Sequence, residues 1–91
     1  MKSIIQSKKE CFICKSIYGL EEHHIFYGKA NRKLSERDGL KVYLCPEHHR
    51  GTNGVHGMNG KEINLYLKRI AEKIWMQYYN KTIDDFIKEY R

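Results

Sequence analysis

The sequence predicts a small α+β domain in which a metal-binding half is followed by a helical half, and three observations lead to this prediction. Cysteine and histidine residues gather between residues 11 and 56 at the spacings of zinc ligands. Residues 20–27 and 40–44 have the β-branched, aromatic and alternating apolar residues of short strands. Apolar residues then recur at helical spacing from residue 61 onward.

Length and composition limit what this chain can be. Its 91 residues suffice for one domain, residues 1–91. This is near the size at which a hydrophobic core alone gives only marginal stability and a structural metal adds useful stabilisation. The three cysteines are an odd number without a signal-peptide run, so we expect them to bind metal rather than form disulfides. No apolar segment approaches the roughly 20 residues that cross a bilayer, so we expect a soluble, cytoplasmic protein with no membrane partner. The net charge of +6 favours a polyanionic partner.

The elements that precede residue 45 are expected to be short. Residues 1–10 suggest a frayed arm or a short edge strand, and residues 11–19 a tight loop around zinc. Residues 20–27 suggest a strand, in which successive side chains face opposite ways, so His23 and His24 should have different roles. The polar, glycine-bounded residues 28–39 are expected to form a loop, and residues 40–44 a half-buried strand that leads into a helix at Cys45.

A structural zinc site is predicted from two ligand pairs with zinc spacing. They are a CxxC motif and a CxxH motif with Pro46 at the first helical position, which together give the Cys₃His set Cys11, Cys14, Cys45 and His48. The alternatives are buried thiols beside an exposed histidine by chance, and a redox CxxC. The redox interpretation lacks the βαβ setting that this motif requires.

A second metal site is implied by the remaining histidines. Neighbouring helical residues point about 100° apart, so His49 cannot face the same metal as His48. His23, His24 and His56 are also left over. Four imidazoles beside one zinc loop suggest a metal held by histidines and a histidine free to move protons. The alternative is that they are surface histidines or satisfied core histidines.

The C-terminal half is expected to be helical. Residues 51–60 contain four glycines and should lack regular structure unless something, such as His56, fixes them. Residues 61–79 should form the longest helix, with a core-facing stripe through Ile63, Leu67, Ile70, Ile74 and Tyr78. Four further residues should broaden this buried stripe, namely Leu65, Tyr66, Trp75 and Met76. Thr82 and Asp85 resemble a capping box that opens a final short helix through Tyr90.

The motifs CFIC, EHHI and LCPEHHR resemble those of zinc-stapled HNH endonucleases with the ββα-metal, or His-Me finger, fold. The run LEEHHIFYGKANRKLSERDGLKVYLCPEHHRGTNGVH is similar to small phage and prophage HNH nucleases akin to the RecA-dependent Ref nuclease. The resemblance covers about residues 11–56, and the helices of residues 61–91 add nothing specific. It implies a metal-dependent DNA endonuclease of a phage or prophage, which leaves a 3′-hydroxyl and a 5′-phosphate.

Residue roles follow from the resemblance position by position. It implies that His23 is a ligand of a catalytic divalent ion, which can be Mg²⁺, Mn²⁺ or Zn²⁺, and that His24 is the general base. His49 is a further ligand, because His48 replaces the usual last cysteine of the zinc set. His56 is the histidine available as one more ligand.

The middle asparagine of the HNH motif has no clear counterpart in this sequence. The matching place is Gly39 or Leu40, neither of which has a side-chain amide. Asp38 and Asn31 are the candidates for its role.

Cations are expected to hold the DNA backbone by sequence-independent, salt-sensitive contacts. Arg50 is the nearest in sequence to His49 and is expected to face the phosphate itself. The candidate nucleic-acid-binding residues are Lys29, Arg32, Lys33, Arg37 and Arg50. The alternative for the first four is a solvated loop, and for Arg50 a solvated helix residue.

Two questions of function and assembly stay open at this point. The rival function is a zinc-stabilised nucleic-acid-binding or interaction module without catalysis, and the missing asparagine supports it. A homodimer through the helix of residues 61–79 is possible. Dependence on a recombinase filament rests on family analogy alone.

Overall fold

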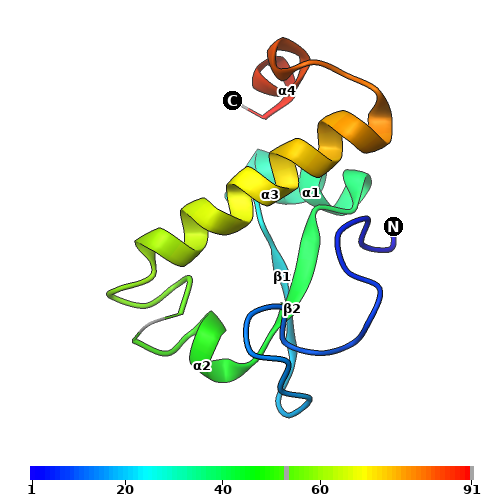
Figure 1. Ribbon diagram of the computed structural model, residues 1–91. Coiled ribbons are helices and arrows are strands. Elements are labelled where there is room, and N and C mark those ends of the chain that lie inside the picture. The colour runs from blue at the N-terminus through cyan, green and yellow to red at the C-terminus, as the bar shows by residue number, and fades with distance from the viewer. Residues whose placement is uncertain (53, 91) are drawn as a thin grey trace.

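The computed structural model describes residues 1–52 and 54–90 and has an α+β architecture (Figure 1). In the described part of the chain, one two-stranded sheet is combined with four helices. The elements follow one another as β1 (Glu21–His24), α1 (Lys29–Asp38), β2 (Lys41–Leu44), α2 (Pro46–His49), α3 (Lys61–Tyr79) and α4 (Ile83–Glu89). The predicted class is therefore confirmed. None of the helices in these residues is long and apolar enough to span a membrane.

The two strands form an antiparallel hairpin that is the centre of the molecule. His23 pairs with Val42 and His24 with Lys41. The predicted core-facing residues of the second strand, Leu40, Val42 and Leu44, are all buried, but Lys41 on the opposite face is buried as well. Helix α1 follows one end of the hairpin and α2 the other (Figure 1).

Strand β1 is shorter than the predicted residues 20–27, and a side chain explains where it ends. The amide of Ile25 still donates to Leu40 O at 3.0 Å. The next residue leaves the ladder, because both the N–H and the C=O of Phe26 bond to Ser35 Oγ, at 3.1 and 2.7 Å. The Ser35 hydroxyl thus makes the two backbone hydrogen bonds of Phe26 that a neighbouring strand would otherwise make.

The prediction of a loop over residues 28–39 was wrong, because these residues form helix α1. The two glycines mark the ends of a helix, not of a loop. Gly28 is the N-cap residue, and Gly39 closes the helix in the left-handed conformation with φ of 75°. The buried residues of α1 are Ser35 and Asp38, and Leu34 is its one apolar residue packed against the core, so its inward face is mostly polar and gives little hydrophobic periodicity to detect.

The N-terminal arm lies along the free edge of β2, neither frayed nor as a regular strand. Ile4 N donates to Gly39 O at 3.0 Å, and Phe12 N donates to Tyr43 O at 2.9 Å. Between them, the side-chain oxygen of Gln6 accepts from Tyr43 N at 2.8 Å. The arm therefore covers the backbone groups of an edge strand that would otherwise be open to pairing with another chain.

Helix α3 has the bounds that the sequence predicts, and α4 ends at Glu89, one residue before the predicted end. Asn80 ends α3 in the left-handed conformation, and the Thr82–Asp85 capping box is present. The stripe on α3 is displaced from the predicted one, because its buried residues are Leu67, Ala71 and Trp75. Three residues predicted to belong to the buried stripe are instead exposed, namely Leu65 (44%), Tyr66 (54%) and Tyr78 (59%).

Asp38 joins α1 to both C-terminal helices. Its carboxylate accepts from Trp75 Nε1 at 2.9 Å and from Tyr90 Oη at 2.6 Å, and Arg37 donates to it at 2.7 and 2.9 Å. Asp38 O also accepts from Tyr79 Oη at 2.9 Å. Burial raises the pKa of Asp38, but these donors outweigh it and hold the pKa below its ordinary value.

Candidate metal centres

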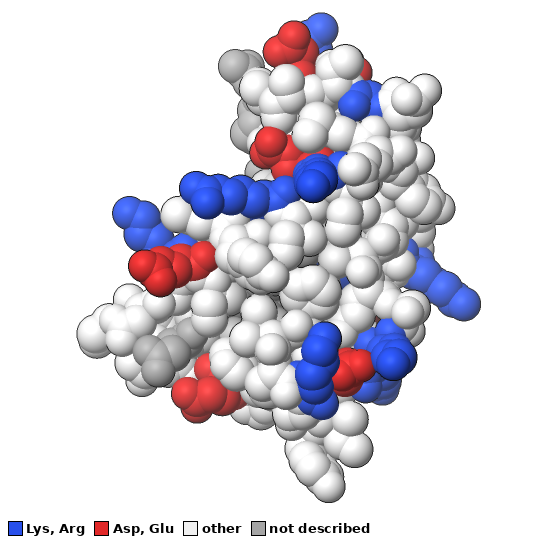
Figure 2. Space-filling model, in the orientation of Figure 1, with Lys and Arg blue, Asp and Glu red and all other residues white. Residues whose placement is uncertain are grey.

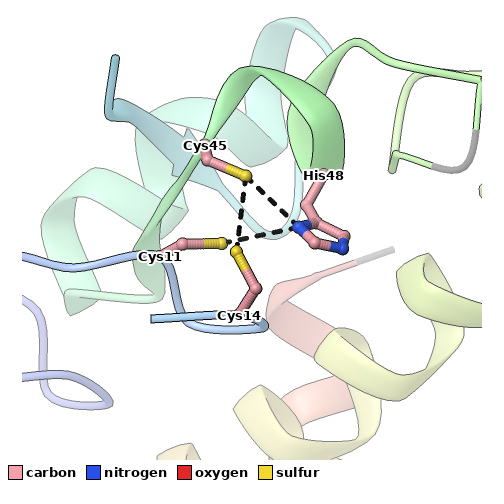
Figure 3. Close-up of side chains that lie close together, drawn as sticks. All are labelled: Cys11, Cys14, Cys45 and His48. Carbon is pink, nitrogen blue, oxygen red and sulfur yellow. Dashed lines mark hydrogen bonds between the residues drawn. The ribbon is translucent and has the colours of Figure 1, made fainter. Parts of the chain in front are cut away.

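The predicted Cys₃His set comes together at the end of β2 (Figure 3). Cys11 and Cys14 lie on the loop before β1, Cys45 follows β2, and His48 belongs to α2. Their ligand atoms all lie within 4.8 Å of one another. His48 Nδ1 is 3.2 Å from Cys45 Sγ and 3.8 Å from Cys11 Sγ, and the sulfurs of Cys14 and Cys45 are 3.7 Å apart.

These distances suit a structural zinc ion. Tetrahedral coordination with Zn–S bonds of about 2.3 Å places neighbouring ligand atoms roughly 3.5–3.8 Å apart. Burial raises the pKa of the Cys11 thiol, but the backbone N–H groups of Cys14, Cys45 and Ile13 outweigh it and lower that pKa to about 6. The loop therefore favours the thiolate form of Cys11, which is the form that binds metal.

Three of the four remaining histidines form a second cluster. His23 comes from β1, His49 from α2 and His56 from the glycine-rich segment, and their ligand atoms also lie within 4.8 Å of one another. Their ring centroids are 5.3 Å (His23–His49), 5.2 Å (His23–His56) and 4.9 Å (His49–His56) apart. The structure thus brings together the three residues expected to be ligands of the catalytic ion.

Residues 54–56 fold back on α2 and bring His56 to the cluster. Val55 N donates to His48 O and His56 N donates to His49 O, each at 3.0 Å, and Val55 is buried. The seven-residue separation of His49 and His56 is thus closed by backbone hydrogen bonds. Asn53 lies outside the described residues.

The three imidazoles fit a divalent ion. His23 Nε2 is buried and has no hydrogen-bond partner among the described residues. Burial lowers the pKa of His23 to about 3, and the positive charges of neighbours, including His49, His56 and Lys68, add to this effect. A neutral imidazole with a free nitrogen is the form that binds metal.

Glu21 orients one of the three rings, and the sequence interpretation missed it. His49 Nδ1 lies 2.7 Å from Glu21 Oε1, which leaves Nε2 of His49 as the ligand atom. Arg50 Nε donates to the same oxygen at 3.1 Å. The strand period gives a signal that could have found it, because Glu21 and His23 are two residues apart and share a face of β1.

His24 lies on the other side of β1, away from the three-histidine cluster. Its Nε2 is 2.7 Å from Glu36 Oε1 on α1. Hydrogen bonds from His24, from Lys41 and from the N-terminal ammonium group lower the pKa of Glu36 to about 2. The ligand atoms of Glu22, His24 and Glu36 are close together, but Lys41 Nζ pairs with both carboxylates, at 3.5 and 2.9 Å. This group is therefore an ion-pair network and not a cation site.

A hollow of about 630 Å³ opens beside His24. Three basic residues of α1 line it together with Glu36 and Gly28, namely Lys29, Arg32 and Lys33. They stand at i, i+3 and i+4, so one face of the helix presents all three. These are three of the five cations expected to bind nucleic acid.

The other two expected cations are engaged with carboxylates. Arg37 donates to Asp38 and, at 3.0 Å, to Glu89, and Arg50 donates to Glu21. On the face shown in Figure 2, the Lys and Arg side chains of the described residues lie in separate groups with Asp and Glu between them. Basic side chains are therefore dispersed on that face, whereas Lys29, Arg32 and Lys33 gather at the hollow beside His24.

Two of the positions considered for the missing asparagine, Leu40 and Asp38, are engaged elsewhere in the structure. Leu40 is buried in the core, and the carboxylate of Asp38 is occupied by donors from Arg37, Trp75 and Tyr90. A carboxylate does reach His24, but it is that of Glu36, one helical turn before Leu40.

In comparisons with protein-family models, curated proteins and solved structures, this chain has no significant match. The chemistry available is that of the two clusters. One can hold a structural zinc through thiolates, and the other presents three imidazoles, two of which have a pKa lowered by burial.

Proposed function

We propose that this protein is a metal-dependent DNA endonuclease of the HNH type that hydrolyses phosphodiester bonds. The observation that carries the proposal is the three-histidine cluster, in which a buried ring nitrogen of His23 has no protein partner among the described residues. A module that only binds nucleic acid needs the zinc set for stability. It has no use for a second group of converging imidazoles.

The order of elements supports a ββα-metal core. Strand β1, strand β2 and helix α2 follow one another, with His23 on the first strand and His49 on the helix. Helix α1 forms the connection between the two strands. The zinc set ties the loop before β1 to the start of α2, which would hold the three elements together.

A divalent ion held by His23, His49 and His56 would supply Lewis-acid stabilisation of the negative charge that builds up on the phosphate. Glu21 keeps the His49 ring in the orientation that ligation needs.

His24 is the proposed general base. Its Nε2 donates to Glu36, so Nδ1 is left to accept a proton from the attacking water. Glu36 thus fixes the tautomer of the base, as carboxylates do for catalytic histidines in other enzymes. General-base catalysis of this kind typically contributes about 10²–10⁴-fold.

The DNA backbone is proposed to lie along α1. Lys29, Arg32 and Lys33 line the hollow that also contains His24. Contacts to phosphates by such a helix face would be sequence-independent and salt-sensitive. A homodimer and a recombinase filament stay predictions.

The rival function is a zinc-stabilised module that binds DNA without cutting it. One observation favours it, namely that His24 and the three-histidine cluster lie on opposite sides of β1. The two functions differ in what happens when His24 is removed.

The test is plasmid nicking by the wild type, His24→Ala and the matched control Glu22→Ala, each with Mg²⁺, with Mn²⁺ and with chelator. Glu22 lies two residues before His24 on the same strand, and its ion-pair partner is Lys41. We expect metal-dependent nicking by the wild type and the control, and a loss of at least about 10²-fold in His24→Ala with an unchanged circular dichroism spectrum. Salt-dependent DNA binding by all three proteins without nicking would favour the rival.

A further inference from the structure

Tyr27 borders the three-histidine cluster. Its ring centroid lies 5.4 Å from that of His56 and 5.9 Å from that of His23. The residue is nevertheless 40% exposed. The ring therefore stands at the boundary between the cluster and solvent.

Helix α3 holds this ring at two positions one turn apart. Asn64 Nδ2 donates to Tyr27 Oη at 2.7 Å, and Lys68 Nζ lies 5.2 Å from the centre of the ring. Residues at i and i+4 share a helix face. That face of α3 is thus the one turned toward the cluster.

Asn64 carries an unpaired buried atom. Among the residues that the structure describes, two buried side-chain nitrogen or oxygen atoms have no hydrogen-bond partner, and they are His23 Nε2 and Asn64 Oδ1. Both belong to residues that contact Tyr27. An amide can present either its oxygen or its NH₂ group, because rotation about its last torsion exchanges them and Tyr27 Oη can donate or accept. Asn64 can therefore donate to an anion.

Lys68 is a half-buried cation that makes no ion pair with an Asp or Glu of residues 1–52 or 54–90. Its ammonium group lies over the Tyr27 ring. Arg50, which the sequence suggested for the phosphate, donates instead to Glu21. A cation without a counter-ion beside neutral imidazoles attracts anions.

We propose that Asn64 and Lys68, with Tyr27 between them and the histidines, form a phosphate subsite, and that Lys68 is the catalytic cation facing the scissile phosphate. This inference rests on the proposed nuclease function. Lys68 supplies fixed positive charge where the transition state gains negative charge, and Asn64 supplies a hydrogen bond. Tyr27 keeps both side chains in place and limits the access of water.

The experiment compares Lys68→Met with Arg69→Met, since Arg69 is the next residue of α3 and is exposed. Both changes remove one positive charge and keep an unbranched stem. Lys68→Arg is the conservative variant. The first readout is single-turnover nicking of plasmid DNA with Mn²⁺. The second is independent of cleavage and measures how far the protein increases the broadening of the phosphorus NMR signal of inorganic phosphate beyond that caused by the same Mn²⁺ in buffer.

We expect Lys68→Met to nick about 10²-fold more slowly than the wild type and to lose the broadening, since removal of one preorganised charge-stabilising group costs about 10²–10³-fold. Arg69→Met should stay within about twofold, and Lys68→Arg should recover part of the loss. Equal nicking and broadening in the two methionine variants would overturn the subsite and leave the nuclease standing. A wild type that neither nicks nor broadens the signal would overturn both. A wild type that broadens the signal without nicking, with the effect lost in Lys68→Met, would overturn only the nuclease and keep the phosphate site.

Discussion

The substitution Glu21→Gln should weaken divalent-ion binding at the three histidines and leave the Cys₃His set unchanged. Glu21 Oε1 lies 2.7 Å from His49 Nδ1. Hydrogen bonds from His49 and Arg50 hold the pKa of Glu21 below its ordinary value, so it is a carboxylate at neutral pH. A charged acceptor on the far nitrogen makes the ligating nitrogen of an imidazole more basic, and the neutral amide of glutamine does so less.

The size of the effect follows from the exposure of this carboxylate. Loss of a group that orients a metal-ligating histidine typically costs about 10–100-fold in metal affinity. The Glu21 side chain is 41% exposed, so water screens part of its charge. We therefore expect the lower end of that range, which is a dissociation constant for Mn²⁺ about tenfold higher than that of the wild type.

The assay is calorimetric titration of Mn²⁺ into protein already loaded with one equivalent of Zn²⁺. Glu22→Gln is the matched control, because it makes the same chemical change on the next residue of β1, which pairs with Lys41 instead of a histidine. Arg50→Gln is the second control, because Arg50 also donates to Glu21. If Glu21→Gln and Glu22→Gln bind Mn²⁺ equally well, the orienting role of Glu21 is wrong.

Three further predictions concern stability and the base. Asp38→Asn should lower the free energy of unfolding in urea by at least about 2 kcal/mol, because buried donors lose a charged acceptor. Because the folded-state pKa of Asp38 lies below the ordinary 3.8, its stabilisation is present above pH 3.8 and fades below it, so the difference between wild type and variant should shrink as the pH falls below 3.8. Thr82→Ala should cost about 1 kcal/mol in the same assay through loss of the α4 cap, and an unchanged urea midpoint would contradict this. Glu36→Ala removes the acceptor that orients the His24 ring, so it should slow single-turnover nicking at least about tenfold. Glu36→Gln keeps an acceptor and should retain most of the wild-type rate. Equal nicking rates of Glu36→Ala and the wild type would refute the positioning role.

The zinc set and the C-terminal helices could be predicted from the sequence because their signals are local. Zinc takes ligands in pairs at fixed short spacing, and CxxC and CxxH each provide such a pair. The bounds of α3 follow from a helical pattern that ends at Asn80, and α4 begins at a capping box only four residues long. The three histidines of the second cluster were also predicted to lie at one site, through the resemblance of the histidine motifs.

Helix α1 could not be predicted because its buried face is polar. Ser35 and Asp38 are inward-facing for their hydrogen bonds to Phe26 and to Trp75, and hydrophobic periodicity carries no information about such bonds. With α1 missed, Glu36 had no defined position relative to His24.

The sequence by itself determined which side chains can bind metal, since that depends on residue type and local spacing. Only the tertiary structure decided which residues contact these side chains and which charges lie near them. Glu36 reaches His24 from a separate helix. Lys68 is more than forty positions after His23 along the chain, yet its charge contributes to the lowered pKa of the His23 ring. Such pairings depend on how elements pack against one another, because a helical pattern shows which side is apolar but does not show which polar residue of the remaining face meets a site.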